Sequence, residues 1–215
     1  MTCYFQGCND KGITKEHIPP RSFFPDGEKK QLLTVKSCKR HNNDKSKDDL
    51  YVLAQICMNA SPSNRAREVF MNKVSPQLEF NNGALRKRLA DGAVRLAKGA
   101  VKYKVDIARL DDFFTALSCG IVFKSCGSSL PANYTIRHIF HSFQGAADPL
   151  VRQLEDAIGA FYDGEPTGIL EFGSPDARNE RIYTATIFGV PDFRSSITIV
   201  HRFFGVFKVT SMLSR

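Results

Sequence analysis

The spacing of hydrophobic residues divides the chain into a strongly patterned C-terminal half and a more polar N-terminal half. Within residues 105–215, apolar side chains recur at helical spacing from about Asp106 to Cys126, which predicts a long core helix. Residues 134–140 alternate between apolar and polar as a strand does, and residues 149–162 show the pattern of an amphipathic helix. These elements predict a C-terminal α+β domain that is long enough to bury its own core.

Further strands are expected in the last quarter of the chain. Three segments there are rich in β-branched and aromatic residues and are separated by glycine and proline. They are residues 167–172, 181–188 and 197–209. Together with residues 134–140, they predict an antiparallel sheet that is packed by helices.

The first 55 residues show shorter elements. Residues 12–18 contain β-branched side chains and predict a short strand that ends at the following prolines, and residues 31–36 predict the return strand. The sequence Pro-Asp-Gly-Glu at 25–28 has the chemistry of a turn between them. Residues 39–54 are polar at first and apolar toward the end. This pattern favours a helix that packs its later residues against a core. The order strand, strand, helix predicts a ββα unit within residues 1–55.

The connection between these two units, residues 56–104, is expected to be helical. Ser63 is a candidate N-cap for a helix that runs to about Val74. Residues 84–104 combine leucines and alanines with a dense basic run that only Asp91 opposes. This combination predicts a basic helix.

Three cysteines and a histidine near the start of the chain have the spacing of a structural zinc site. Zinc takes about four ligands in a tetrahedron, which proteins usually supply as two close pairs with a longer connection between them. Cys3 and Cys8 form one pair, and Cys38 and His41 form the other. A hairpin between the pairs would bring them together. We therefore expect these four side chains to bind Zn²⁺.

Two other arrangements would use these cysteines differently, as unligated thiols or as disulfides. The start Met-Thr-Cys-Tyr-Phe has neither the basic region nor the apolar stretch of a secretory signal, so we expect reduced thiols and a cytoplasmic protein. A rival metal site would combine two cysteines of one helix with two histidines, but its spacing lies outside the usual range for chelation. Its members would be Cys119, Cys126, His138 and His141.

The sequence EHIPP at residues 16–20 lies between the two ligand pairs, and Asn42 follows the last ligand directly. With the zinc pattern, these residues resemble the HNH nucleases of the ββα-metal type, over residues 1–55. The resemblance implies that Glu16 and Asn42 hold a catalytic Mg²⁺ or Mn²⁺ ion and that His17 is the general base that activates water. These roles agree with the oxygen preference of Mg²⁺ and with the titration of imidazole near neutrality. The family is common in restriction, phage defence and mobile elements.

The sequence departs from the commonest family pattern in three ways. Glu16 stands where aspartate is more usual, and His41 stands where a fourth cysteine is commoner. Asn42 stands where many members carry the final histidine. In addition, the middle asparagine that gives the family its name has no counterpart between the prolines and Lys36. Three residues there have side chains that could replace it: Asp26, Gln31 and Thr34.

Two further acids follow the zinc ligands in the sequence. Asp48 and Asp49 are the nearest additional carboxylates to the expected site. Lys45 and Lys47 lie beside them, so the group is typical of a solvated helix face. We therefore place both acids outside the metal shell.

The excess of positive charge lies in the N-terminal half. Residues 1–104 contain 20 Lys and Arg against 10 Asp and Glu, whereas residues 105–215 contain 10 against 12. A polyanion is therefore expected to bind the N-terminal half. Because aromatic side chains are scarce in the basic run, we expect contacts to the backbone of duplex DNA rather than base stacking. The expected contacts are Arg86, Lys87, Arg88, Arg95 and Lys98.

Two functions are consistent with these features. The first is a metal-dependent HNH-type endonuclease that hydrolyses DNA phosphodiester bonds, with RNA as an alternative substrate. The second is a zinc-braced nucleic-acid-binding protein without catalysis, which the missing asparagine allows. In either case residues 105–215 would provide specificity, dimerisation or sensing. No membrane association is expected, because no stretch approaches the roughly 20 apolar residues of a membrane span.

Overall fold

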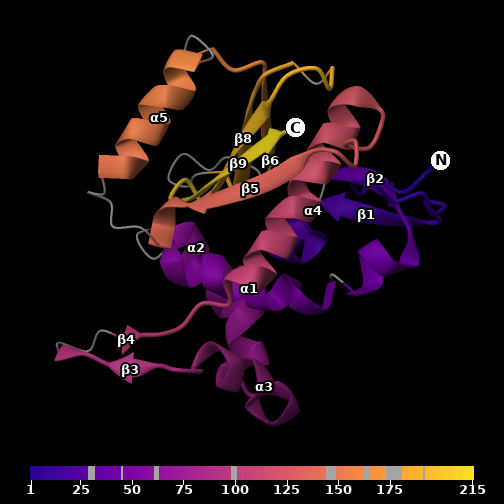
Figure 1. The fold of residues 1–215 in the computed structure, drawn as a ribbon. Helices are drawn as coiled ribbons and strands as arrows, with labels where there is room; N and C mark the ends of the chain where they lie inside the picture. Colours follow the sequence, from indigo (N-terminus) through magenta and orange to yellow (C-terminus); the bar gives the residue numbers. More distant parts are fainter. Residues whose placement is uncertain are drawn as a thin grey trace.

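The chain folds into a five-stranded antiparallel sheet, a long central helix, and an N-terminal unit of a hairpin and helices (Figure 1). The structure is a computed structural model, and it describes most of the chain. The described residues are 1–28, 32–44, 46–60, 63–97, 101–143, 149–161, 165–172, 181–190 and 192–215. The mixed α+β fold and the C-terminal antiparallel sheet that the sequence predicts are confirmed.

The N-terminal unit has the predicted order of two strands followed by a helix. β1 and β2 pair antiparallel, and a π-helical turn, η3, precedes the helix α1. Gln31, where the return strand was expected to begin, lies outside the described residues. The elements are β1 (Thr14–Ile18), η1 (Arg21–Phe23), η2 (Asp26–Glu28), β2 (Leu33–Ser37), η3 (Arg40–Asp44) and α1 (Ser46–Asn59).

The connecting region begins with the predicted helix. The hydroxyl oxygen of Ser63 accepts a hydrogen bond from the backbone N–H of Ala66 at 3.2 Å, so Ser63 is the N-cap of α2. Short helices and then a small hairpin follow. The elements are α2 (Asn64–Val69), η4 (Phe70–Val74), η5 (Ser75–Gln77), α3 (Phe80–Leu89), β3 (Val94–Arg95) and β4 (Val101–Lys102).

The prediction of one basic helix over residues 84–104 is wrong. α3 ends at Leu89, and β3 and β4 then pair as a two-stranded antiparallel ribbon, with Val94 opposite Lys102. The cause is local: Gly92 adopts a left-handed backbone with a φ of 64°, which breaks the helix and favours glycine. The β-branched valines beyond it prefer extended backbone.

The long helix α4 (Ile107–Cys126) is the predicted core helix. Asp106 caps its first turn by accepting from the N–H of Arg109, and Gly127 closes it in the left-handed conformation. α4 packs against the N-terminal hairpin and also against strands of the C-terminal sheet. A Cβ added at Gly120 would lie 1.7 Å from Cδ1 of Ile18, so the glycine leaves the space that the Ile18 side chain of β1 occupies.

The C-terminal sheet has the strand order β5-β9-β8-β7-β6, and all its neighbouring strands are antiparallel. The expected single strand over residues 197–209 is two strands, because Phe204 and Gly205 form a turn with positive φ. The elements are β5 (Thr135–Phe140), η7 (His141–Phe143), α5 (Pro149–Phe161), β6 (Gly168–Phe172), β7 (Tyr183–Phe188), β8 (Ile197–Phe203) and β9 (Phe207–Ser214).

Aromatic side chains join the N-terminal unit to the sheet through α4. Phe23 stacks on Phe113 of α4 with ring centroids 5.3 Å apart, and both rings contact Phe203 of β8. Phe114 lies between Phe203 and Phe207 on the same face of the sheet. Buried residues of the hairpin, the helices and the sheet therefore belong to one hydrophobic cluster.

Candidate metal centre and its surroundings

The four predicted zinc ligands come together at one end of the N-terminal hairpin. Their ligand atoms all lie within 4.8 Å of one another. Nδ1 of His41 is 3.3 Å from Sγ of Cys38 and 3.4 Å from Sγ of Cys3, and Sγ of Cys8 is 4.0 Å from Sγ of Cys38. Tetrahedral zinc, with bonds of about 2.3 Å to sulfur and about 2.0 Å to nitrogen, would separate its ligands by about 3.5–3.8 Å. The group could therefore hold a metal such as zinc.

Backbone hydrogen bonds hold the first ligand pair in place. The N–H of Cys3 donates to the carbonyl of Asp10 at 2.9 Å, and the N–H of Cys8 donates to the carbonyl of Phe5 at 3.2 Å. These bonds fold residues 1–12 into a compact loop beside β2. The second pair is tied to the first because the N–H of Cys38 donates to Sγ of Cys3 at 3.4 Å. A backbone donor to a ligand sulfur is the kind of contact that orients a metal ligand.

The surroundings of the centre favour metal binding by the histidine. Phe5 stacks on the ring of His41 with centroids 4.1 Å apart and an interplanar angle of 10°. Burial, and then the charge of Arg40, lower the pKa of His41, which favours the neutral imidazole that a metal ion binds. Burial raises the pKa of the Cys8 thiol to about 11. A bound cation would reverse that effect, since coordination deprotonates a thiol.

Neither the disulfide alternative nor the rival metal site is seen among the described residues. All six cysteines are free, and the four N-terminal ligands form the one metal-ligating cluster found in the described part of the chain. Cys126 donates from its Sγ to the carbonyl of Val122 within its own helix. His138 contacts the hydroxyls of Thr115 and Ser211. The rival site is therefore not assembled.

Glu16 and His17 lie on opposite faces of the hairpin. Glu16 is 7% exposed and lies on the side of Val35 and Ile18, which faces the core. His17 is half-buried on the other side and lies directly opposite Thr34 of β2. Thr34, one of the residues considered as replacements for the middle asparagine, therefore lies on the same face as the proposed base.

Asn42 links the turn after the zinc ligands to β1. Its side-chain Nδ2 donates to the backbone carbonyl of Lys15 at 3.3 Å, and its own N–H donates to the carbonyl of Cys38 at 3.2 Å. Lys15 immediately precedes Glu16 and His17 in β1. The structure thus brings the segment that carries Asn42 against the strand that carries the other two predicted catalytic residues.

The two acids of α1 have different surroundings. Asp48 forms an ion pair with Arg109 and lies 3.7 Å from Arg88, which agrees with its placement outside the metal shell. Asp49 is half-buried, and its charge, after burial and after Glu16, contributes to the raised pKa of the Tyr4 hydroxyl. Asp49 and Glu16 therefore both lie near Tyr4, in the interior beneath the hairpin.

A cavity of about 330 Å³ opens beside the metal centre, between η3, α1 and α4. Asp49 lines it together with Asp112 of α4, although sequence reasoning had placed Asp49 on a solvated face. The signal was present in the helical spacing, because Asp49 precedes Leu53 by four positions and Ile56 by seven, and both of these are buried. The other lining residues are Phe5, Arg40, His41, Asp48, Arg109, Phe113 and Ala116.

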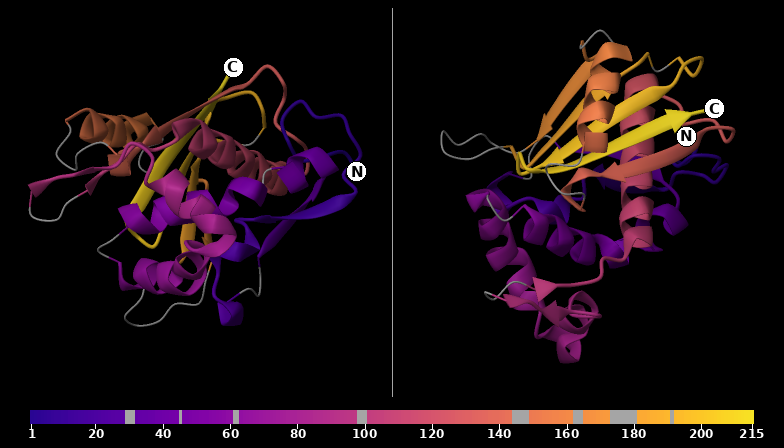
Figure 2. Two further views of the ribbon diagram at one scale, coloured as in Figure 1. Left: turned by 90° about the horizontal axis from the view of Figure 1, so that it is seen from below. Right: turned by 60° about the vertical axis from the view of Figure 1, so that its left-hand side comes forward.

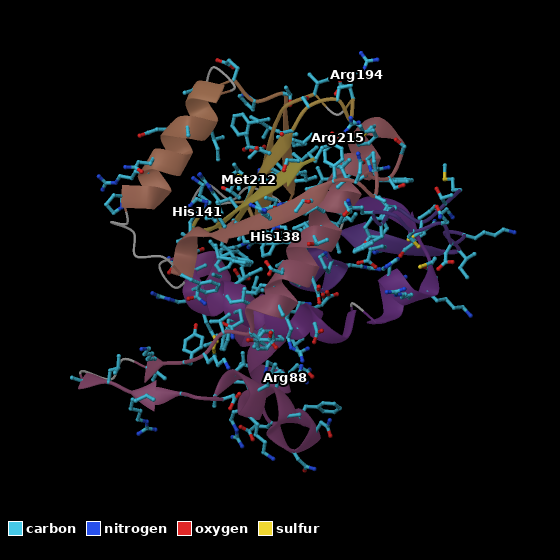
Figure 3. The ribbon with its side chains drawn as sticks, in the orientation of Figure 1. Arg88, His138, His141, Arg194, Met212 and Arg215 are labelled. Atoms are coloured by element: carbon cyan, nitrogen blue, oxygen red, sulfur yellow. The ribbon has the colours of Figure 1, made fainter. Side chains whose placement is uncertain are left out.

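The predicted phosphate contacts lie away from the zinc cluster, on α3 and on the ribbon of β3 and β4. Arg86, Lys87, Arg88 and Arg95 are all exposed, and Lys98 lies outside the described residues. Arg86 pairs with Glu79 at 2.5 Å, and Arg88 approaches Asp48 of α1. Figure 3 shows Arg88 where α3 meets the helices above it.

No described helix combines the length and the apolar composition that crossing a membrane requires. Comparisons of this chain with family models, with curated proteins and with solved structures find no match.

Proposed function

We propose that this protein is a metal-dependent endonuclease that hydrolyses phosphodiester bonds of DNA, built on a hairpin and helix that zinc holds together. The observation that carries the proposal is the hydrogen bond from Asn42 to the carbonyl of Lys15. It joins the turn that follows the zinc ligands to the strand of Glu16 and His17. Three residue types suited to phosphodiester hydrolysis are thereby gathered within one small unit, as the resemblance to HNH nucleases implies.

His17 would act as the general base. Its imidazole is half-buried and lies opposite Thr34, so it can reach solvent while β2 supports it. A neutral imidazole can take a proton from water near pH 7. The threonine hydroxyl would orient the ring, which is the task of the asparagine that this sequence lacks.

Glu16 and Asn42 would hold the divalent ion, Mg²⁺ or Mn²⁺. Because Nδ2 of Asn42 already donates to Lys15, its Oδ1 is the atom left for a ligand, and hard cations prefer such oxygens. When bound, the ion would supply charge stabilisation to the phosphate and to the leaving oxygen. The carboxylate of Glu16 lies in the interior, near Tyr4 and Asp49, where water is scarce and a charge interacts strongly.

Zinc would have a purely structural role at Cys3, Cys8, Cys38 and His41. These ligands come from the N-terminal loop, from the end of β2 and from η3. Binding would fix all three segments at once, as structural zinc sites do in small units with little core of their own. It would also set the position of Asn42, which follows the last ligand.

A plasmid assay tests the proposal. Purified protein with supercoiled plasmid and Mg²⁺ or Mn²⁺ is expected to nick or linearise the DNA, and His17→Ala is expected to reduce the rate by about a hundredfold or more. Lys15→Ala, at the neighbouring exposed position of the same strand, is the matched control and should keep most activity, because only its backbone carbonyl contacts Asn42. Both variants should retain zinc. Binding without cutting by all three proteins would refute the nuclease proposal.

One observation favours a second candidate, a zinc-braced nucleic-acid-binding protein without catalysis. Glu16 is buried on the opposite face of the hairpin from His17, so the pair does not converge on one open cavity. Under this reading Glu16 is structural. The discriminating result is a protein that retards DNA with a strong salt dependence, cuts none of the tested substrates with any divalent ion, and loses stability in Glu16→Gln.

A further inference from the structure

The ribbon formed by β3 and β4 is an arm that extends from the body of the molecule (Figures 1 and 2). In Figure 1 it projects at the lower edge of the molecule, on the side away from the C-terminal sheet. Val94 pairs with Lys102 and Arg95 pairs with Val101. All four of these side chains are exposed. We refer to residues 93–97 and 101–104 as the arm.

The arm is anchored at its base. The hydroxyl of Tyr103 accepts a hydrogen bond from Nδ2 of Asn59, at the end of α1, at 3.0 Å. Just beyond, the N–H of Asp106 donates to the hydroxyl of Tyr51 at 2.9 Å. Both hydrogen bonds reach α1, so the base of the ribbon is fixed to that helix.

The surface of the arm combines exposed apolar side chains with cations. Val94, Leu96 and Val101 are 57%, 51% and 51% exposed, which is unusual for large apolar residues gathered on one small element. Because residues paired across a ribbon point to the same side, each face carries one valine beside one cation, Lys102 on one face and Arg95 on the other. Neither cation forms an ion pair with a described residue.

Charge complementarity identifies the partner. The described residues 80–97 and 101–104 carry six Lys and Arg against one Asp, so the arm and α3 form a strongly positive edge. A two-stranded ribbon matches the width of the major groove of B-form DNA, where cations can contact bases or phosphates and apolar side chains can contact thymine methyl groups. An isolated ribbon of this length is marginally stable in water, so a partner that encloses it would also order it.

We propose that the arm enters the major groove of B-form duplex DNA, while Arg86, Lys87 and Arg88 of α3 contact the flanking phosphates. The inference rests on the proposed function in that nucleic acid is the ligand, but it does not require that the protein cuts. It specifies that the ligand is a B-form DNA duplex. The major groove of A-form RNA is too narrow for side chains to read, and the arm lacks the aromatic platform that single strands use.

The first test measures affinity with His17→Ala protein, so that cutting cannot interfere. A 20-base-pair DNA duplex, an RNA duplex and a DNA single strand of the same sequence serve as probes. Arg95→Gln/Lys102→Gln is expected to bind the DNA duplex about tenfold more weakly and to lower the salt slope by about 1.8, that is, about 0.9 for each lost phosphate contact. Arg137→Gln/Arg202→Gln, two exposed cations of the C-terminal sheet, is the matched control and should change neither quantity.

The second test separates groove contact from charge. Val94→Ser/Leu96→Ser/Val101→Ser keeps every cation, so it should weaken binding to the DNA duplex about fivefold without changing the salt slope, and it should leave RNA binding unchanged. Replacing thymine by deoxyuridine in the probe removes the methyl groups. That replacement should weaken the parent protein but not the triple serine variant.

The outcomes distinguish this inference from the nuclease proposal. A protein that never cuts but whose arm variants lose duplex affinity supports the arm and refutes catalysis. A protein that cuts, with arm variants that bind duplex DNA as tightly as the parent, overturns the arm proposal alone. The proposal is also overturned if the serine variant changes the oligomeric mass of the free protein in sedimentation while DNA affinity stays constant, because the arm would then be a protein interface.

Discussion

The Nδ1 atom of His41 lies 3.3 Å from the Sγ atom of Cys38, three residues earlier in the chain. This contact and its companions place a nitrogen and three sulfurs where one ion can bind them all. Phe5 covers the imidazole ring and fixes its plane. The identity of the ligand nitrogen follows, since Nδ1 rather than Nε2 faces the cysteines.

Removal of one of the four ligands should release the metal. Purified wild-type protein is expected to contain about one zinc per chain, and Cys38→Ser should contain almost none, because a hydroxyl is a poor replacement for a thiolate. The apparent melting temperature should fall by at least several degrees, since metal binding and folding are coupled. Elemental analysis and thermal unfolding with and without a chelator measure both effects.

Cys126→Ser is the matched control for that experiment. Its thiol is half-buried on α4 and bonds within its own helix, so zinc content should stay at the wild-type value. A Cys38→Ser protein that still carries a full equivalent of zinc would show that the ligands have been misassigned.

Substitutions at His41 test the choice of nitrogen. His41→Cys should retain zinc, because its sulfur can occupy the fourth corner close to where Nδ1 lies, and four-cysteine sites are common. His41→Gln should lose at least tenfold in zinc affinity, because its amide extends toward the position of Nε2, which faces away from the sulfurs. Competition with a zinc indicator gives the affinities. Equal affinity for the two variants would contradict ligation through Nδ1.

The gathering of the four candidate metal ligands could be predicted from the sequence because each half of the group is local. Cys38 and His41 are three residues apart and Cys3 and Cys8 are five, so short loops fix most of the geometry. The helices with clear apolar spacing, such as α4, could be predicted for the same reason. In such elements, the spacing of apolar residues over a few turns is enough to predict the secondary structure.

Features set by long-range contacts could not be predicted. The arm was expected to be helix, since alanine and leucine favour helices and a single glycine did not outweigh them. That Glu16 and His17 face opposite sides follows from the strand itself, but which of the two is buried depends on the side of the hairpin that α4 covers. Asp49 was expected in solvent because its lysine neighbours dominate the local charge, although its helical spacing from Leu53 points inward.

Gly120→Ala should destabilise the protein, although alanine is the better helix former. The new Cβ would lie 1.7 Å from Cδ1 and 2.9 Å from Cγ1 of Ile18, so the Ile18 side chain must repack or β1 must shift. Overpacking of this kind costs about 1–3 kcal/mol, which exceeds the gain in helix propensity of about 1 kcal/mol. Urea unfolding at pH 7 measures the difference.

Ile18→Val provides the control for the Gly120 substitution. It removes the Cδ1 atom that meets the new Cβ, so Gly120→Ala should cost less in the Ile18→Val background than in the wild type. An equal cost in both backgrounds would mean that the contact between α4 and β1 does not limit the packing.

Acid should weaken the contact between α4 and the C-terminal sheet through His138, which lies on β5 (Figure 3). Burial lowers the pKa of His138 from 6.5 to about 4, and its two ring nitrogens contact the hydroxyls of Thr115 and Ser211. Because the folded pKa lies below the unfolded value, the unfolded chain binds more protons between these limits. The stability from the neutral histidine is therefore complete above about pH 6.5 and is lost as the pH falls toward 4.

The expected loss is about 2–3 kcal/mol by pH 4, at about 1.4 kcal/mol for each unit of pKa shift. Urea unfolding of the zinc-loaded protein at pH 7 and pH 5 measures the part of this loss that falls in that interval, about 2 kcal/mol. His138→Gln cannot titrate, so its stability should fall less over this interval than that of the wild type. Arg137→Gln, at the adjacent exposed position, should keep the wild-type dependence. Protonation of the zinc ligands affects all three proteins equally, so a difference confined to His138→Gln assigns the acid sensitivity to this buried imidazole.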